Sequence, residues 1–508
     1  MRPGSLFRLA FVGTRSDRAR VPVTAAGAAI AVLVLLCCAT VLSIESAAGR
    51  YHNRMLTQPG LLLNVAVAML LCSIPILFLV AQCARLGAPA RNRRLAALRM
   101  AGATPRQITW VAAVETGLAA MIGSVVGVVG YLVGRVLLDR PDPAGVRPLP
   151  TDVLPSVTAI VAIAVAVPLL TTLLTVVLLR RVAITPFGVL RQSRQQPVRA
   201  WPTLLLGLGL GGLVSISAVM RSEYVRQGGF GANRDDLFVI ALLGCTVVML
   251  LGLMFTVAWI GYRSARLLLR VTRRPSALIA ARQILADPHA GSRSFTVILV
   301  VTAFGAAAMM LHSWLDTEVA VRTAAMLDPA LGYDTPPLDL GGTAAFRSEV
   351  RTLVDAVLVS LIGVAALTLL IALVEAGVAR RRAIAALVAG GTPRAVLARA
   401  LCWRVLLPAV PGIAIAGLVG LAGMRAFTTT ATAGWGRTVC VGTPAECAGP
   451  DAERHLEYRE VTHTLQAAVP WADIVAVMSI ALLAVLLVIG ASVLMHRSTT
   501  DPAELRAS

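Results

Sequence analysis

Residues 93–106 read RRLAALRMAGATPR, and residues 381–394 read RRAIAALVAGGTPR. The two segments are identical at eight of fourteen positions, including the double arginine at the start and Gly-x-Thr-Pro-Arg at the end. Self-similarity at a fixed offset, here 288 residues, indicates an internal duplication. The chain is therefore expected to contain two copies of one structural unit.

Each repeated segment is predicted to form a short helix, a sharp turn and the start of a second helix. Ala, Leu, Met and Arg dominate residues 90–101, and all four favour helix. Gly102 stands where a left-handed residue commonly ends a helix, and Gly390 is its counterpart. Thr104 is then expected to cap a new helix whose first turn begins with Pro105.

The chain around these segments is too apolar for a water-soluble protein. Only 14% of its 508 residues are charged and 57% are hydrophobic, whereas soluble domains are about 25% charged. Stretches long enough to cross about 30 Å of hydrocarbon occur at residues 21–44, 60–83, 108–138, 153–179, 202–220, 237–261, 296–314, 352–378, 400–426 and 472–495. The sequence therefore predicts an all-α polytopic membrane protein with about ten spans, and it excludes soluble, disordered and fibrous classes.

The ten stretches follow a 4+2+4 arrangement. Residues 1–200 are expected to form the first four-helix repeat, 201–262 two linking helices, and 263–508 the second repeat. In each repeat the duplicated segment lies between the second and third spans. Modest extracellular loops are expected at 315–351 and 427–471.

Arginine counts predict the orientation. All 46 basic residues are arginine, and the connections at 1–20, 84–107, 180–201, 262–295, 379–399 and 496–508 hold 30 of them against 4 carboxylates. The alternate connections hold 13 arginines against 18 carboxylates. Cytoplasmic loops are rich in Lys and Arg, so both termini are expected to be cytoplasmic, and the net charge of +20 is not read as a sign of nucleic-acid binding.

With these motifs the sequence resembles the FtsX-like permease family of ABC transporters. The resemblance rests on the double arginine, the short helix, Gly-x-Thr-Pro-Arg and a following glycine-spaced helix. Those glycines are Gly123, Gly127, Gly130 and Gly134 in the first copy and Gly412, Gly417 and Gly420 in the second. The ten-helix plan is similar to permeases that protect Gram-positive bacteria from peptide antibiotics, which implies a bacterial plasma membrane.

The resemblance also implies which residues contact an ATPase subunit. In that family the short helix between the second and third spans touches the ATPase and transmits its closure. The residues that carry this expectation are Arg93, Arg94, Gly102, Thr104, Pro105, Arg106, Arg381, Arg382, Gly390, Thr392, Pro393 and Arg394.

The chain itself is expected to have no ATPase activity. A P-loop needs a lysine that reaches the β/γ-phosphates, and the sequence contains no lysine. We find no catalytic constellation and no ligand spacing typical of a metal site. The expected partner is a separate ABC ATPase, in two copies, which binds ATP and Mg²⁺, while this chain binds no cofactor.

The expected function is export or membrane extraction of a hydrophobic or amphiphilic compound, such as an antibiotic, a peptide or a lipid. Two alternatives remain open at this point. Internal repeats are also common in ion-coupled secondary transporters, and a membrane signalling or regulatory protein is the third possibility.

Two further pairs of residues are candidate sites. Glu375 and Arg404 lie within predicted spans on either side of the second repeated segment, where charges are costly. They are either an intramembrane pair or structural side chains that extend toward the interface. Cys440 and Cys447 lie in the last outer loop with turn-forming residues between them, so a disulfide is predicted in this oxidising compartment.

The arginine asymmetry yields a direct test of topology. Val388→Cys is expected to be protected from an impermeant maleimide in intact cells, whereas Gly341→Cys and Gly434→Cys are expected to react. The background for each variant lacks Cys440 and Cys447. Labelling of Val388→Cys together with protection of Gly341→Cys would overturn the orientation.

Overall fold

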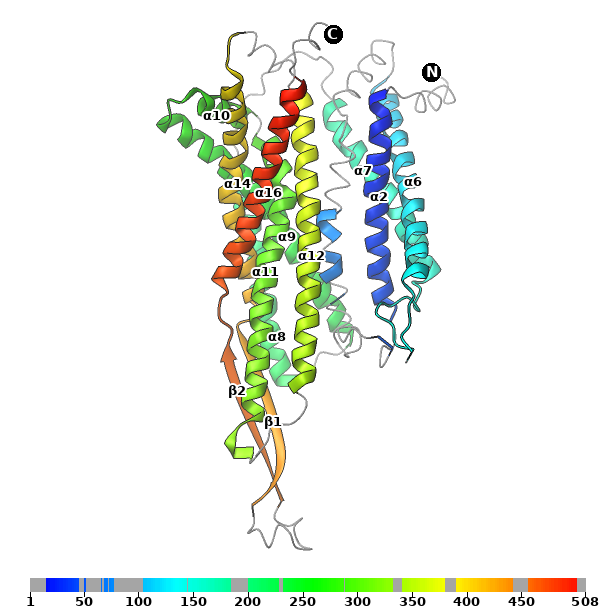
Figure 1. Cartoon of the computed structure of the whole chain (residues 1–508), viewed down its shortest axis with the longest axis vertical. Helices are drawn as coiled ribbons and strands as arrows, with labels where there is room; N and C mark the ends of the chain where they lie inside the picture. Colours follow the sequence, from blue (N-terminus) through cyan, green and yellow to red (C-terminus); the bar gives the residue numbers. More distant parts are fainter. Residues whose placement is uncertain are drawn as a thin grey trace.

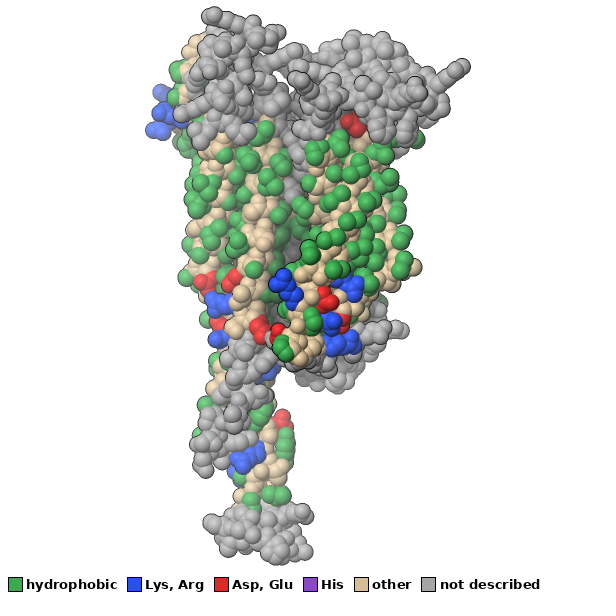
Figure 2. Space-filling model, turned by 45° about the vertical axis from the view of Figure 1, so that its right-hand side comes forward, with side chains coloured by type: hydrophobic (Ala, Val, Ile, Leu, Met, Phe, Trp, Pro, Cys, Tyr) green, Lys and Arg blue, Asp and Glu red, His purple; other side chains and the backbone are tan. Residues whose placement is uncertain are grey.

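The computed structural model is a long helical assembly with a two-stranded β-hairpin at one end (Figure 1). It describes residues 15–44, 50–51, 65, 68–71, 73–76, 104–143, 145–183, 200–227, 232–286, 288–331, 340–379, 390–441 and 456–499. A broad band of hydrophobic side chains covers the helices in Figure 2, and charged side chains gather where this band gives way to the hairpin end. This distribution is typical of a protein whose middle lies in hydrocarbon.

A first bundle contains α2 (Arg15–Leu42), α6 (Pro105–Leu138) and α7 (Val157–Ala183). Its core contains Val32 and Leu36 from α2, Ala120 and Tyr131 from α6, and Val167 from α7. The hydroxyl groups of Thr40 and Tyr131 share a buried hydrogen bond of 2.6 Å, which joins α2 to α6. A polar contact between two helices of this kind satisfies groups that would otherwise be costly in hydrocarbon.

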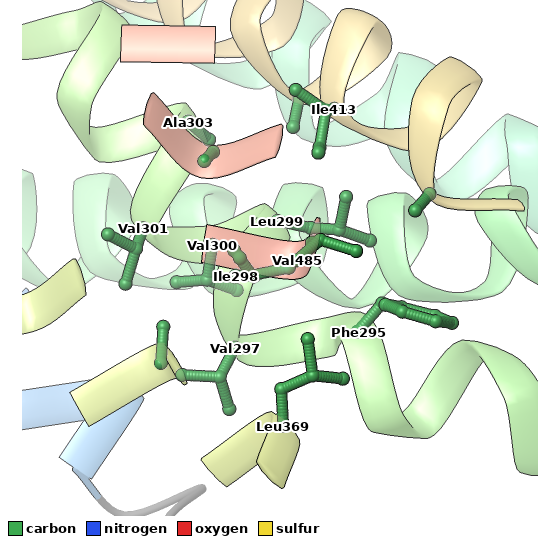
Figure 3. Packing of buried hydrophobic residues seen from close by; sticks show 14 of the residues in the cluster. Phe295, Val297, Ile298, Leu299, Val300, Val301, Ala303, Leu369, Ile413 and Val485 are labelled. Carbon is green, nitrogen blue, oxygen red and sulfur yellow. The ribbon is translucent and has the colours of Figure 1, made fainter. Parts of the chain in front are cut away.

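A second, larger bundle surrounds α11. Its helices are α8 (Pro202–Gln227), α9 (Ala232–Val271), α10 (Pro275–Ala286), α11 (Pro288–Met326), α12 (Leu340–Ala379), α14 (Arg394–Arg425) and α16 (Trp471–Thr499). In α11 the run Phe295–Ala303 is buried at every position (Figure 3). Leu369, Ile413 and Val485 pack around it from α12, α14 and α16. The two helices expected to link the repeats, α8 and α9, contribute to this same core.

The structure confirms a mostly helical, multi-pass protein, with eight helices among the described residues that are long and apolar enough to span a membrane. These correspond to eight of the ten predicted spans. A ninth, at 153–179, coincides with α7, whose apolar part Val157–Leu173 is shorter. Most of the predicted span 60–83 lies outside the described residues, and the 4+2+4 repeat arrangement stays a prediction.

A short helical segment at residues 73–76 lies between the two bundles. Ile76 belongs to the core of the first bundle, whereas Ile74 packs against the core of the second. Figure 1 shows this segment between α2 and α12. Residues of the second predicted span therefore contact both bundles.

The prediction of an all-α fold is wrong in one respect, because the loop 427–471 contains a hairpin. Strand β1 (Thr430–Cys440) pairs antiparallel with β2 (Leu456–Gln466) along its full length, from Thr430 opposite Gln466 to Cys440 opposite Leu456. Both strands contain Thr, Val and an aromatic residue, which are residue types enriched in strands. Hydropathy alone did not reveal this pattern.

The other long connection, 315–351, also contains more regular structure than the sequence predicts. Helix α11 continues to Met326 and α12 already begins at Leu340, so much of the loop is helix. The indole N–H of Trp314 donates to the carbonyl oxygen of Thr430 at 3.2 Å, and His463 and Asp328 are joined at 2.7 Å. These contacts hold the hairpin against the extension of α11.

Glycines bring the third helix of each predicted repeat against the backbone of the first. A Cβ at Gly123 of α6 would collide with the carbonyl oxygen of Ala25 in α2. A Cβ at Gly420 of α14 would collide with the carbonyl oxygen of Ala303 in α11. By contrast, a Cβ at Gly134 meets nothing within 4 Å. Helix backbones this close require a residue without a side chain at the crossing.

Gly123→Ala is expected to lower the free energy of unfolding by about 1–3 kcal/mol, because the added methyl group forces α6 away from α2. The matched control is Gly134→Ala, which places the same methyl group in open space and is expected to change stability by less than about 1 kcal/mol. Thermal unfolding of the purified protein in detergent measures both. Equal destabilisation by the two variants would contradict the proposed role of the α2–α6 crossing.

Candidate functional site

Helix α6 begins at the first repeated segment as the sequence predicts. Thr104 is the N-cap residue, and its hydroxyl oxygen accepts from the backbone N–H of Gln107 at 3.3 Å. The side-chain oxygen of Gln107 accepts from the backbone N–H of Thr104 at 3.0 Å, which completes a capping box. Pro105 occupies the first turn, where its missing N–H is not needed.

Helix α14 begins differently at the second repeated segment. Its N-cap position is Pro393, with no side-chain cap, and the helix starts at Arg394. Ala395 stands where the first copy has Gln107. The second copy therefore has no side-chain amide that could form a capping box. The residue in the left-handed conformation of this turn is Gly391, at φ +83°, one position later than the predicted Gly390. The corresponding residue in the first copy is Ala103.

Several predicted coupling residues fall outside what the structure describes. The placements of Arg93, Arg94, Gly102, Arg381 and Arg382 lie outside the described residues. Pro105, Arg106 and Arg394 are placed in the helix backbone only. Their assignment to an ATPase contact therefore stays a prediction.

The starts of α6 and α14 lie at the same end of the protein. Figure 1 shows the start of α6 and the start of α14 at the end opposite the hairpin, together with the start of α2 and the end of α16. Each repeated segment is thus followed at once by a helix that runs the full depth of its bundle.

The N-terminal half of α14 packs against a small hydrophobic cluster about four turns after the helix begins. Ala265 of α9 and Ala281 and Ile284 of α10 are buried there, with Leu407 of α14 packed against them. A Cβ at Gly261 would stand 3.1 Å from the Cβ of Pro408, so α9 and α14 are also in close contact just below this cluster. Helices α9 and α10 therefore contact α14 at Leu407 and Pro408, in its N-terminal half.

The proposed pair of Glu375 and Arg404 stays a prediction. The side chain of Glu375 lies outside the described residues, while Arg404 is half-buried in α14. The disulfide is defined from one side only. Cys440 is disulfide-bonded at the end of β1, and Cys447 lies outside the described residues, so their pairing stays a prediction.

A polar cluster closes the hairpin-side end of the first bundle, and sequence reasoning missed it. The hydroxyl of Tyr51 donates to Asp152 at 2.7 Å, and Arg50 forms an ion pair with the same carboxylate at 3.4 Å. Arg147 forms an ion pair with Asp139 at 2.8 Å. Since Tyr51 and Asp152 are about a hundred positions apart, no local sequence pattern predicts their contact.

Electrostatics follows from these contacts. Burial and the hydrogen bond to Asp152 raise the pKa of Tyr51 to about 12. Burial opposes ionisation of Asp152, but hydrogen bonds from Tyr51 and Arg50 outweigh it and hold the pKa of this carboxyl below its ordinary value. Hydrogen bonds from Arg147 and Thr151 lower the pKa of Asp139. The lowered pKa values keep both carboxylates ionised at neutral pH, while Tyr51 keeps its proton and donates a hydrogen bond to Asp152. We call the group Arg50, Tyr51, Asp139, Arg147 and Asp152 the polar clasp.

The eight long apolar helices among the described residues make this chain a multi-pass helical membrane protein. Among the described residues, no group of His, Cys, Asp and Glu side chains is arranged to hold a metal ion.

The comparison with known families then names the domain. Residues 65–186 match the FtsX-like permease C-terminal family. The chain therefore carries an FtsX-like permease domain, typical of ABC transporter permease subunits, which are membrane subunits without ATPase activity and pair with ABC ATPases. The matched range includes the first repeated segment, α6 and α7. No curated protein and no solved structure gives a significant match.

The capping difference between the two copies gives a matched pair of variants. Thr104→Ala is expected to destabilise the first turn of α6 by about 1 kcal/mol, because the N–H of Gln107 loses its acceptor. Thr392→Ala is the control, since Thr392 does not cap α14. In Thr104→Ala, amide hydrogen exchange in the first turn of α6 is expected to become roughly fivefold faster. In Thr392→Ala, exchange in the first turn of α14 is expected to stay unchanged. A similar response at both helices would contradict the assigned caps.

Proposed function

We propose that this chain is the membrane subunit of an ABC transporter that moves a hydrophobic or amphiphilic compound, such as a lipid, a peptide or an antibiotic. The observation that supports it is the position of the two helix starts after the repeated segments. Both lie at one end of the protein, and each leads into a helix packed backbone to backbone against the first helix of its group. A pair of ATPase subunits docked at this end would act on both helices at once.

The proposed mechanism is mechanical. Closure of two ATPase subunits around ATP displaces the short segments that precede α6 and α14. Because α6 contacts α2 at Gly123 and α14 contacts α11 at Gly420 without intervening side chains, displacement of the third helix moves the first. In this chain α11 continues directly into the contact with the hairpin, so the movement reaches the outer end.

Substrate entry from the lipid fits the outer surface of the first bundle. Val125, Val129 and Val136 of α6 and Val161 and Val165 of α7 are more than half exposed. Such side chains face acyl chains in a membrane. The outer connection of the first bundle, 139–152, is short and tied down by the polar clasp. The positive-inside pattern supports an orientation in which the repeated segments are cytoplasmic and the hairpin is outside.

Gly391→Val is expected to abolish stimulation of the partner ATPase while leaving membrane insertion near normal. A β-branched residue at φ +83° costs roughly 1–2 kcal/mol, so the turn before α14 relaxes and the docking angle changes. The assay is ATP hydrolysis by the co-purified complex in lipid nanodiscs, compared with the ATPase subunit alone.

Gly145→Val is the matched control. Gly145 has φ +78°, and a Cβ there also meets nothing within 4 Å, but it lies in the connection 139–152. The same strain is expected to leave ATPase stimulation unchanged. Full ATP-dependent transport by Gly391→Val, or an isolated chain that transports with an ion gradient and binds no ATPase, would refute the proposal.

A further inference from the structure

The end of α9 carries a basic stripe, defined here as the exposed side chains Arg263, Arg266, Leu267, Arg270 and Val271. Their spacing places all five on one face of the helix. Leu267 is 63% exposed and Val271 75% exposed, so large apolar side chains alternate with guanidinium groups on the same surface. The opposite face is buried, because Tyr262 and Ala265 point into the protein and Ala265 packs against α10.

The charge of this region is entirely positive. Exposed Arg273 and Arg274 follow in the turn to α10, and Arg282 is exposed on α10 itself. Residues 261–286 contain no Asp or Glu. Within the part of the chain that the structure describes, none of the stripe arginines forms an ion pair. The charge is therefore available to an anionic ligand.

Two aromatic rings hold the guanidinium groups in place. The guanidinium carbon of Arg263 lies 5.3 Å from the centre of the Trp259 ring, and that of Arg266 lies 4.8 Å from the centre of the Tyr262 ring. Stacking uses the face of a guanidinium and leaves its in-plane N–H groups free to donate to phosphate oxygens. Trp and Tyr are also the residues that favour the headgroup level of a bilayer.

The length of α9 places the stripe at the membrane boundary. The apolar segment Leu237–Val271 has 35 residues, or about 52 Å at 1.5 Å per residue, against about 30 Å of hydrocarbon. This segment is about 20 Å longer than the hydrocarbon is thick, so its ends reach the boundary between acyl chains and headgroups. Figure 1 shows α10 and the adjoining end of α9 projecting sideways from the bundle, at the end where α14 begins.

We infer that the basic stripe binds the headgroups of anionic phospholipids in the leaflet on this side of the membrane. A purely soluble protein partner would leave Leu267 and Val271 without a reason to lie among arginines. At the boundary between headgroups and acyl chains, arginine pairs with phosphate while leucine and valine enter hydrocarbon. Because Ala265 of α9 packs with Ile284 of α10 and Leu407 of α14, the bound lipid lies against elements that contact the N-terminal half of α14.

The test uses the purified full-length chain in dodecyl maltoside, titrated with dioleoylphosphatidylglycerol or dioleoylphosphatidylcholine and read by native mass spectrometry. Wild type is expected to bind phosphatidylglycerol in preference to phosphatidylcholine. Each arginine near an anionic surface contributes about fivefold, so Arg263→Gln/Arg266→Gln/Arg270→Gln is expected to weaken phosphatidylglycerol binding about 100-fold. This experiment requires neither transport nor a known orientation, so its failure is distinct from failure of the proposed function.

The control is Arg140→Gln/Arg351→Gln/Arg425→Gln, which removes the same charge from exposed positions toward the hairpin end. It is expected to change binding less than threefold. If the stripe triple variant unfolds, Arg270→Gln alone is expected to show the fivefold loss. Equal binding of both lipids by wild type, or equal losses in the two triple variants, overturns the inference. A stripe variant that still binds phosphatidylglycerol but no longer binds the ATPase subunit also overturns it, because the surface would then be a protein-docking site.

Discussion

Two helix crossings without side chains between them determine how the rest of this protein is arranged. At Gly123 and at Gly420 the third helix of a group lies directly on the carbonyl oxygens of the first. Hydrophobic burial does not drive helix association inside a bilayer, so close packing of this kind supplies the specificity. Two polar contacts add to this packing in the first bundle. The buried hydrogen bond between Thr40 and Tyr131 joins α2 to α6, and the polar clasp around Asp152 joins the connections at the hairpin-side end.

The membrane makes part of this fold readable from sequence. Inside hydrocarbon the backbone must bond to itself, so an apolar stretch of sufficient length is a helix, and the predicted spans correspond well to the observed ones. Outside hydrocarbon that constraint disappears. The hairpin of β1 and β2 depends on pairing between Thr430 and Gln466, which are 36 positions apart, and hydropathy carries no information about such pairing.

The candidate site was predictable to a similar degree. Thr104, Gln107 and Pro105 form a local capping signal, because every partner lies within three residues. At the second copy the glycine pair 390–391 allowed two positions for the left-handed turn, and only the structure assigns φ +83° to Gly391. The basic stripe was visible as arginine excess, but its alternation with exposed Leu267 and Val271 required knowledge of which face of α9 is buried.

The unequal beginnings of α6 and α14 have a consequence for symmetry. Helix α6 begins with a capping box of two reciprocal side-chain hydrogen bonds. Helix α14 begins without a side-chain cap, after a glycine in the left-handed conformation. A two-fold symmetric pair of docking subunits would therefore contact two helix starts that differ in their capping, so the two contacts would not be identical. If the two units do descend from a duplication, as the repeated segments indicate, they have since diverged from equivalence at the ends where a shared partner would bind.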